Sequence, residues 1–318
     1  MLSYRHAFHA GNHADVFKHL TLALITKAYC RKDKPFAYFD AQAAAALYSL
    51  DDSRALQTGE AESGICALLK QTDSDGAAQA VLDSADKALL EKDEAAAKEA
   101  AATFAEYLEF CRNLQASAGL YAGSPAVVCN FARPQDQLVL MELHPSEIEI
   151  LKANVELIKK GALGKTDVSS IHVHHRDGFA GLKAMLPPKQ PLPARGFTLL
   201  DPSYEIDKDY SDVEDAVKCA ARSWHNSAIA VWYPLVERRR EKTLHLKEAC
   251  LATDQEVLCA ELCVSKPENE HGLYGSGMIV VNPPWKLDIQ LETLLPFLAK
   301  KLGGADASFR INVQNLSI

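Results

Sequence analysis

The most regular feature of the chain is an alternation of short apolar runs with helix-length stretches, which begins at Phe36. This pattern is typical of strands in a parallel sheet that helices cover on both faces. The runs predict seven strands, at residues 36–39, 138–141, 171–174, 197–200, 229–233, 257–264 and 278–281. Seven strands in this order predict an α/β fold with a doubly wound, mostly parallel sheet.

An acidic residue follows each of the first four predicted strands, namely Asp40, Glu142, Asp177 and Asp201. Doubly wound sheets bind ligands outside the carboxyl ends of their strands, so these side chains are candidate ligand contacts. For an adenosyl ligand, Glu142 would accept hydrogen bonds from ribose hydroxyls and Asp177 from an adenine amino group, with Gly178 allowing close backbone approach. Each acid alone could instead be a helix N-cap, but the shared register of all four favours a ligand site.

The gap between the first two predicted strands is much longer than an ordinary crossover. Its centre is rich in Ala, Lys and Glu, and Phe104, Tyr107, Leu108 and Cys111 fall on one helical stripe. We therefore predict a helical insertion over residues 52–117, within a main domain formed by residues 1–51 and 118–318. Residues 51–100 hold twelve acidic and five basic side chains, so we expect this insertion to avoid nucleic acid and to contain no catalytic residue.

Composition narrows the function further. The net charge of −8 argues against a globally basic nucleic-acid binder, but most of the acidity lies in the insertion, which leaves the rest able to face a polyanion. No run approaches the roughly 20 apolar residues of a membrane span, and the N-terminus has no secretory pattern. We expect a cytoplasmic protein without membrane contacts. The eight scattered cysteines include no Cys-x-x-Cys pair and indicate neither a disulfide framework nor a zinc knuckle.

The N-terminal segment is dense in polar side chains, including four histidines between residues 6 and 19. These, with the cluster at residues 172–175, raise a metal-site hypothesis, but the spacing supplies neither a nearby Glu nor an obvious third ligand, so we expect no metal. We interpret the segment as a flexible lid leading into a helix near Asn12, with Lys18 and His19 turned toward the ligand crevice. The alternative is an amphipathic first helix with solvated polar residues.

The loop Asp201-Pro202-Ser203-Tyr204 follows the fourth predicted strand and nearly matches the Asp/Asn-Pro-Pro-Tyr loop of amino-group methyltransferases. The similarity implies that Asp201 and the Pro202 carbonyl accept the two protons of an exocyclic amino group while Tyr204 stacks on the base. An Asp-Pro turn after a strand is the alternative.

A second near-match competes with this loop. Asn282-Pro283-Pro284-Trp285 fits the pattern better by letter, but it follows the last predicted strand, whereas such enzymes use the loop after the fourth. We therefore interpret it as a wall of the substrate pocket or a rigid terminating turn.

Three further features have both a functional and a structural interpretation. Ser124 precedes a helical stretch, where it is placed to cap that helix and to aim its hydroxyl and backbone amides at a cofactor. The basic run at residues 238–242 suits either phosphate binding or a solvated helix face. Residues 232–234 either flank the substrate or fill the core.

Several motifs together resemble the RlmJ family of 23S ribosomal RNA adenine-N6 methyltransferases, which use S-adenosylmethionine. The motifs that carry this resemblance are the sequences at residues 1–6, 9–16, 122–125, 142–145, 177–179, 232–234 and 277–287. The resemblance covers nearly the whole chain and implies a Rossmann-like class I methyltransferase with a helical insertion.

The resemblance also implies roles for individual residues. It makes His19, Ser124, Glu142, Asp177, Gly178 and, from the N-terminal motif, Lys18 cofactor contacts, with Asp201 as the proton acceptor beside the cofactor. It makes Tyr4 and His6 substrate contacts.

The chain departs from the family pattern at two loops. Asp40 to Ala46 reads Asp-Ala-Gln-Ala-Ala-Ala-Ala where the family has Asp-Thr-His-Ala-Gly-Ala-Gly, and alanine reaches positive φ only at a cost of about 1 kcal/mol or more. Gln42 replaces a histidine of the cofactor site, although its amide still hydrogen-bonds. Ser203 replaces the second proline of the catalytic loop and removes rigidity there.

We therefore expect a monomeric enzyme that methylates N6 of an adenine in 23S ribosomal RNA. The alanine-filled loop motivates one alternative, a degenerate paralogue that binds RNA without methylating it. DNA adenine-N6 methylation is the other, because it uses the same chemistry.

Overall fold

The computed structural model describes residues 5–72, 76–267 and 270–314. Within these residues one eight-stranded sheet has the order β10-β8-β9-β7-β6-β1-β4-β5. Its strands are β1 (Ala37–Asp40), β4 (Gln137–Glu142), β5 (Ser170–His175), β6 (Gly196–Leu200), β7 (Ala228–Leu235), β8 (Val257–Cys263), β9 (Gly275–Val281) and β10 (Ser308–Gln314). The seven predicted strands are confirmed, and a small separate sheet pairs β2 (Leu47–Ser49) with β3 (Leu120–Ala122).

No apolar run predicts the eighth strand, β10. It pairs antiparallel with β8 at the edge of the sheet, and its side chains are mostly exposed. An edge strand half open to solvent carries polar residues, so it has no continuous apolar run to reveal it.

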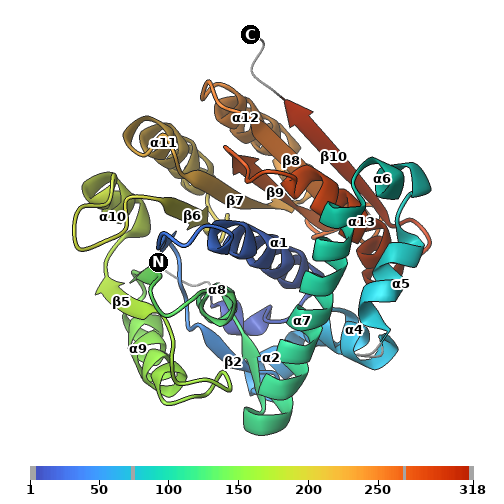
Figure 1. Cartoon of the computed structure of the whole chain (residues 1–318), viewed down its shortest axis with the longest axis horizontal. Helices are drawn as coiled ribbons and strands as arrows, with labels where there is room; N and C mark the ends of the chain where they lie inside the picture. The colour runs from blue at the N-terminus through green and yellow to red at the C-terminus, as the bar shows by residue number, and fades with distance from the viewer. Residues whose placement is uncertain (1–4, 73–75, 268–269, 315–318) are drawn as a thin grey trace.

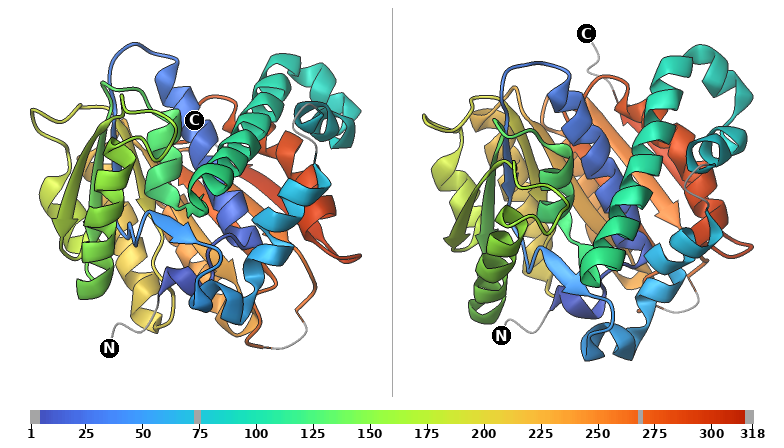
Figure 2. Two further views of the ribbon diagram at one scale, coloured as in Figure 1. Left: turned by 90° about the horizontal axis from the view of Figure 1, so that it is seen from below. Right: turned by 60° about the horizontal axis from the view of Figure 1, so that its bottom comes forward.

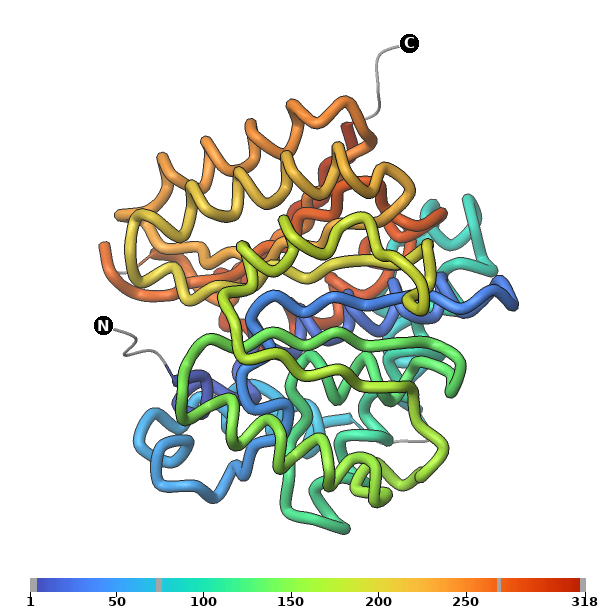
Figure 3. Tube along the Cα trace, turned by 90° about the vertical axis from the view of Figure 1, so that its left-hand side faces the viewer, coloured from blue at the N-terminus to red at the C-terminus, as the bar shows by residue number. Residues whose placement is uncertain are grey.

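Helices cover both faces of the sheet (Figure 1). On one face lie α1 (His13–Cys30), α8 (Ser124–Phe131), α9 (Pro145–Lys159) and α13 (Leu287–Leu302); on the other lie α10 (Gly178–Met185), α11 (Asp207–Ser223) and α12 (Arg240–Leu251). Successive residues of β1 show the division, since Tyr38 packs in the first core whereas Phe39 packs in the second. Figure 3 shows α11 and α12 running side by side in the second layer.

The predicted insertion is helical throughout its described part. It contains α2 (Ser53–Thr58), α3 (Glu60–Ser63), α4 (Ile65–Gln71), α5 (Ala77–Ser84), α6 (Lys87–Lys92) and the long α7 (Glu94–Ala118). The predicted stripe of α7, Phe104 to Cys111, is buried in the same core as α1 and α13. These helices line one side of the molecule (Figure 2). The division into a main domain and an inserted subdomain stays a prediction.

The direction of β9 decides the position of the Asn282 loop. Strand β9 runs antiparallel to β7, with Val281 opposite Ile229 at the beginning of β7. Asn282 therefore lies at the edge of the sheet opposite to the carboxyl end of β6, where Asp201 follows. Its side-chain amide donates to the carbonyl of Ser227 at 3.0 Å. The interpretation as a pocket wall is thus wrong, and the terminating turn describes this loop.

A buried hydroxyl joins the first helix to the sheet and gives a stability prediction. The backbone N–H of Ala228, at the start of β7, donates to Tyr29 Oη at 3.0 Å, and Ala228 is fully buried. Tyr29→Phe removes this acceptor and should lower the free energy of unfolding by about 1–3 kcal/mol, measured by urea denaturation. A change well under this range would show that the N–H finds another acceptor.

Candidate functional site

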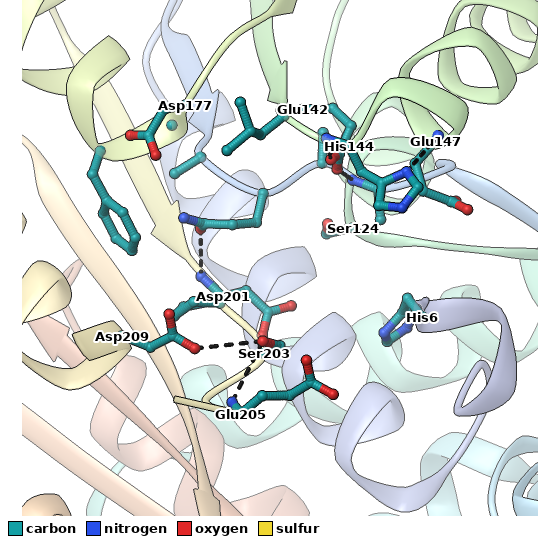
Figure 4. A pocket seen from close by; sticks show the side chains of 18 of the residues that line it. His6, Ser124, Glu142, His144, Glu147, Asp177, Asp201, Ser203, Glu205 and Asp209 are labelled. Atoms are coloured by element: carbon teal, nitrogen blue, oxygen red, sulfur yellow. Dashed lines mark hydrogen bonds between the residues drawn. The ribbon is translucent and has the colours of Figure 1, made fainter. Parts of the chain in front are cut away.

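A cavity of about 320 Å³ opens at the carboxyl ends of the parallel strands. The loops after β1, β4, β5 and β6 all contribute to it, with α1 and the short helix η1 (His6–Phe8) completing one wall. Of the predicted site residues, the cavity is lined by His6, Lys18, Gln42, Ser124, Glu142, Asp177, Gly178, Asp201 and Pro202. Figure 4 shows Asp201 between His6 on one side and the Glu142 and Asp177 loops on the other. The topology thus brings most of the predicted residues to one place.

Asp201 is held by a buried lysine. Lys18 Nζ donates to Asp201 Oδ2 at 2.6 Å and lies 3.0 Å from Asp15 Oδ1. Burial raises the pKa of the Asp201 carboxyl, and the Lys18 ammonium opposes that rise. Burial alone would lower the pKa of Lys18, but Asp15 and Asp201 together raise it above its ordinary value. Lys18 is therefore charged, and it stabilises the ionised form of Asp201.

Asp40 is fully buried beneath the same cavity. It accepts hydrogen bonds from the hydroxyls of Tyr38 and Ser124, each at 2.7 Å. Burial raises the pKa of Asp40 to about 6, although both hydroxyls act against the rise. The predicted cap at Ser124 is wrong: Gly123 is the N-cap of α8, and the Ser124 hydroxyl is committed to Asp40.

The two other strand-end acids hold the loops around them. Glu142 accepts from the backbone N–H of Ala44 at 2.9 Å and of His144 at 2.6 Å, so it ties the loop after β1 to the loop after β4. Asp177 caps α10 by accepting from the N–H of Ala180 at 2.8 Å, so the N-cap alternative holds for this residue alongside its place in the cavity. Their predicted contacts with a ligand stay predictions.

Gly178 is required by a close approach of two backbones. A Cβ at this position would stand 1.8 Å from the carbonyl oxygen of Ala41. The absence of a side chain therefore lets the beginning of α10 pack directly on the loop after β1. The sequence predicted a close approach of Gly178 to a ligand, which stays a prediction, whereas the close approach in the structure is to this loop.

Two residues of the alanine loop, Ala41 to Ala46, have backbone conformations that are strained for alanine but not for glycine. Ala44 has φ +46° and Ala46 has φ +62°, both left-handed. Gln42, in the same loop, accepts from the backbone N–H of Asp201 through Oε1 at 3.0 Å. Gln42 thus joins the loop after β1 to the loop after β6.

Tyr204 does not face the cavity, contrary to the predicted stacking on a base. Its side chain is only 4% exposed, and its hydroxyl donates to the carbonyl of Trp232 at 2.7 Å while the ring packs against Tyr210. Tyr204 also has φ +53°, so the chain turns sharply and directs this ring into the core. The residue anchors the loop, and Asp201, Pro202 and Ser203 form its cavity face.

The N-terminal candidates divide into three groups. His6 lines the cavity, and its Nε2 lies 3.0 Å from Asp15 Oδ2. His19 is fully buried, its Nδ1 lies 3.0 Å from the Tyr121 hydroxyl, and burial lowers its pKa to about 3. A direct cofactor contact does not fit that placement. Tyr4 lies outside the described residues.

The insertion holds the N-terminal segment in place, which sequence reasoning did not anticipate. Glu60 of α3 accepts from the Asn12 amide at 2.9 Å and pairs with His9 Nδ1 at 2.8 Å. The N–H of Ile65 donates to the carbonyl of Gly11 at 2.8 Å. These partners are about 50 residues apart in the chain, so no local sequence signal identifies them.

The basic run at residues 238–242 contacts the loop after β6. Arg239 donates to the carbonyl of Glu205 at 3.1 Å and pairs with Asp207, which Lys242 also contacts at 2.9 Å. Within the described ranges there is no cluster of three or more His, Cys, Asp or Glu side chains arranged for a metal ion. Among the same residues, no helix is long and apolar enough to cross a membrane.

The burial of Asp40 predicts a pH-dependent stability difference. An unfolded aspartate titrates near 3.8 and the folded Asp40 near 6, so its contribution to folding is fully present below pH 4 and is lost as the pH rises through 6. Relative to Asp40→Asn, the wild type should therefore lose about 1–3 kcal/mol of unfolding free energy between pH 4 and pH 7. Urea denaturation at the two pH values measures this difference, and a constant difference would show that Asp40 stays unperturbed.

The left-handed alanines give a matched pair of variants. Both Ala46→Gly and Ala45→Gly remove a buried methyl group. Ala46→Gly also relieves the strain of a positive φ, whereas the φ of Ala45 lies outside the left-handed region. Glycine costs chain entropy in both, so Ala46→Gly should be more stable than Ala45→Gly by about 1 kcal/mol. Equal melting temperatures would mean that the loop stores no such strain.

Comparisons with known proteins agree with this geometry. Residues 90–313 match the model of a family described as "Ribosomal RNA large subunit methyltransferase D, RlmJ". Two proteins named ribosomal RNA large subunit methyltransferase J, from Haemophilus influenzae and from Escherichia coli K12, are each 35% identical over 305 residues, covering 95% of this chain and 94% of theirs.

A crystal structure of a Legionella pneumophila protein superposes with a TM-score of 0.74 at 27% identity, covering 96% of this chain and 98% of that one. The fold and the relatives agree over nearly the whole length, so the resemblance seen in the sequence motifs is confirmed. The chain belongs to the RlmJ family of ribosomal RNA large subunit methyltransferases.

Proposed function

We propose that the protein methylates N6 of an adenine in 23S ribosomal RNA, with S-adenosylmethionine as methyl donor. The observation that carries this proposal is the placement of Asp201 and Pro202, which face one cavity together with Glu142 and Asp177 at the carboxyl ends of neighbouring strands. The names of the relatives indicate ribosomal RNA as the substrate. The residues of the catalytic loop indicate that an amino group accepts the methyl group.

The residues of the cavity fit the proposed cofactor. The acids Glu142 and Asp177 suit the hydroxyl and amino groups of an adenosyl moiety, since ionised carboxylates act only as hydrogen-bond acceptors. Residues Ala41 to Ala44, with their small side chains at three positions, also line the cavity. The excess of acidic side chains around the cavity suits a cationic sulfonium. When bound, S-adenosylmethionine supplies an electrophilic methyl group.

The chain's own residues orient the adenine amino group and counter the positive charge that develops on its nitrogen during transfer. Lys18 occupies Asp201 Oδ2, so Oδ1 is the oxygen available to accept a hydrogen bond from the substrate's N6. The Pro202 carbonyl is proposed to accept the second amino hydrogen. These two acceptors hold the nitrogen lone pair in line for attack, so catalysis rests mainly on positioning. Asp201 must be ionised to act, and its contact with Lys18 keeps it so.

His6 supplies the facing wall of the cavity and is proposed to contact the substrate. The deeply placed Tyr204 fixes the loop from behind, so another group must stack on the base. His6 lines the cavity and shares Asp15 with Lys18, the lysine that contacts Asp201, so its imidazole is proposed for this role.

One alternative keeps specific support. A degenerate RNA-binding paralogue is favoured by the strained alanines and by Ser203, whose hydroxyl contacts Asp209 at 3.4 Å instead of rigidifying the loop as a proline would. Methylation of adenine in DNA would use the same site. The retained contact between Gln42 and the backbone of Asp201 favours an intact catalytic loop, and hence the enzyme.

The two candidate loops provide a test with an internal control. Asp201→Ala should lower methyl transfer to 23S RNA by about 100-fold or more, because the substrate's amino group loses its side-chain acceptor. Asn282→Gly keeps a residue that tolerates φ +53° at the opposite edge of the sheet and should remain active. Transfer from methyl-labelled cofactor measures both variants, with circular dichroism confirming their fold. Retained activity in Asp201→Ala together with loss in Asn282→Gly would reverse the assignment of the catalytic loop.

A further inference from the structure

Asp15 is a buried carboxylate that contacts two residues of the cavity wall without lining the cavity itself. It lies in the first turn of α1 and is 1% exposed. One oxygen, Oδ1, lies 3.0 Å from Lys18 Nζ. The other, Oδ2, accepts from the backbone N–H of Gly11 at 2.9 Å and lies 3.0 Å from His6 Nε2.

We propose that Asp15 is a positioning residue for methyl transfer, which holds Lys18 on a single oxygen of Asp201 and fixes the His6 ring at the cavity wall. The inference rests on the proposed function, because it assigns a task to a residue behind the same site. Asp15 would act only through Lys18 and His6, and would touch neither the cofactor nor the substrate.

The ammonium group of Lys18 is held by two carboxylates at once. Lys18 is 4% exposed and extends between two carboxylates, at 3.0 Å from Asp15 and 2.6 Å from Asp201. An ammonium has three donors on a flexible stem and takes whatever acceptors surround it. With Asp15 engaging one donor from the helix side, the group is held at Asp201 Oδ2. Without that charge, Lys18 is free to centre on Asp201 and to occupy both of its oxygens.

Asp15 itself is held rigidly. Its backbone N–H donates to the Asn12 side chain at 2.9 Å, which is the N-cap of α1. The Gly11 N–H fixes Oδ2, and the Asn12 side chain is in turn held by Glu60 of the insertion. The carboxylate is therefore fixed by backbone contacts before Lys18 and His6 bind to it, as a positioning group requires.

The negative charge of Asp15 also affects the pKa of Asp201. The charged or titratable groups facing Asp201 include Lys18 and Asp15 of α1, His6 of η1, Tyr38 and Asp40 of β1, and Tyr204 of the same loop. Lys18 and His6 lower the pKa of the Asp201 carboxyl, whereas the negative charge of Asp15 raises it. Removing the charge of Asp15 should therefore make Asp201 a weaker base that stays ionised at lower pH. A merely structural defect has no reason to change the pH dependence in this direction.

The experiment compares Asp15→Asn and Asp15→Glu with a matched control, Asp136→Asn. Asp136 is also a fully buried carboxylate, and it accepts from the backbone N–H of Phe36 and pairs with Arg133. It precedes β4, at the edge of the sheet away from the cavity. For each variant one measures kcat and KM with 23S RNA between pH 5 and pH 9, the Kd for S-adenosylmethionine, and the melting temperature.

For Asp15→Asn we expect a folded protein with unchanged cofactor affinity, a kcat reduced by about 10- to 100-fold, and an acid limb of the pH profile moved to lower pH. Asp15→Glu keeps the charge and should return the acid limb to its wild-type position even if kcat stays reduced. Asp136→Asn should lower the melting temperature and leave the pH profile unchanged.

The outcomes separate this inference from the proposed function. Wild-type protein that transfers no methyl group would reject the function itself. Active wild type with an Asp15→Asn variant of near-normal kcat, or with a reduced kcat and an unmoved acid limb, would reject the positioning role. If both Asp15 variants fail to fold, Asp15 serves the fold alone, and the proposal is likewise rejected.

Discussion

The ammonium of Lys18, buried between Asp15 and Asp201, is the contact on which the arrangement of the site depends. It joins the first helix to the loop after β6, two segments 183 residues apart. Neither carboxylate could remain ionised at such depth without a cation, and the lysine would lose its charge without them. Removing Lys18 would leave both carboxylates without the ammonium that they share, so the three residues act as one unit.

Around this unit, the loops at the carboxyl edge hold one another. Gln42 accepts from the backbone of Asp201, Glu142 fastens the loop after β1, and Gly178 lets α10 pack on the carbonyl of Ala41. The left-handed alanines are thus held by neighbours that determine the path of the loop. The loop tolerates alanine because these contacts offset the cost of the strained conformation.

Much of the fold follows from sequence, because buried parallel strands carry continuous apolar runs and their ends bring the acids together. What required the structure is non-local. The exposed edge strand β10 has no apolar run, and the antiparallel direction of β9 removes Asn282 from the site. The positive φ of Tyr204 turns its ring into the core instead of into the cavity. The spacing of Asp15 and Lys18 by three residues was the available signal for their pairing, but only the fold adds Asp201 to it.

The most direct measurement is to incubate the purified protein with methyl-labelled S-adenosylmethionine and 23S RNA from cells that lack its gene, then to digest the RNA and identify the labelled nucleoside. The proposed site predicts label in N6-methyladenosine, which would also show that the alanine loop is compatible with turnover. RNA that is bound but carries no label would contradict the enzymatic assignment and favour the non-catalytic RNA-binding alternative.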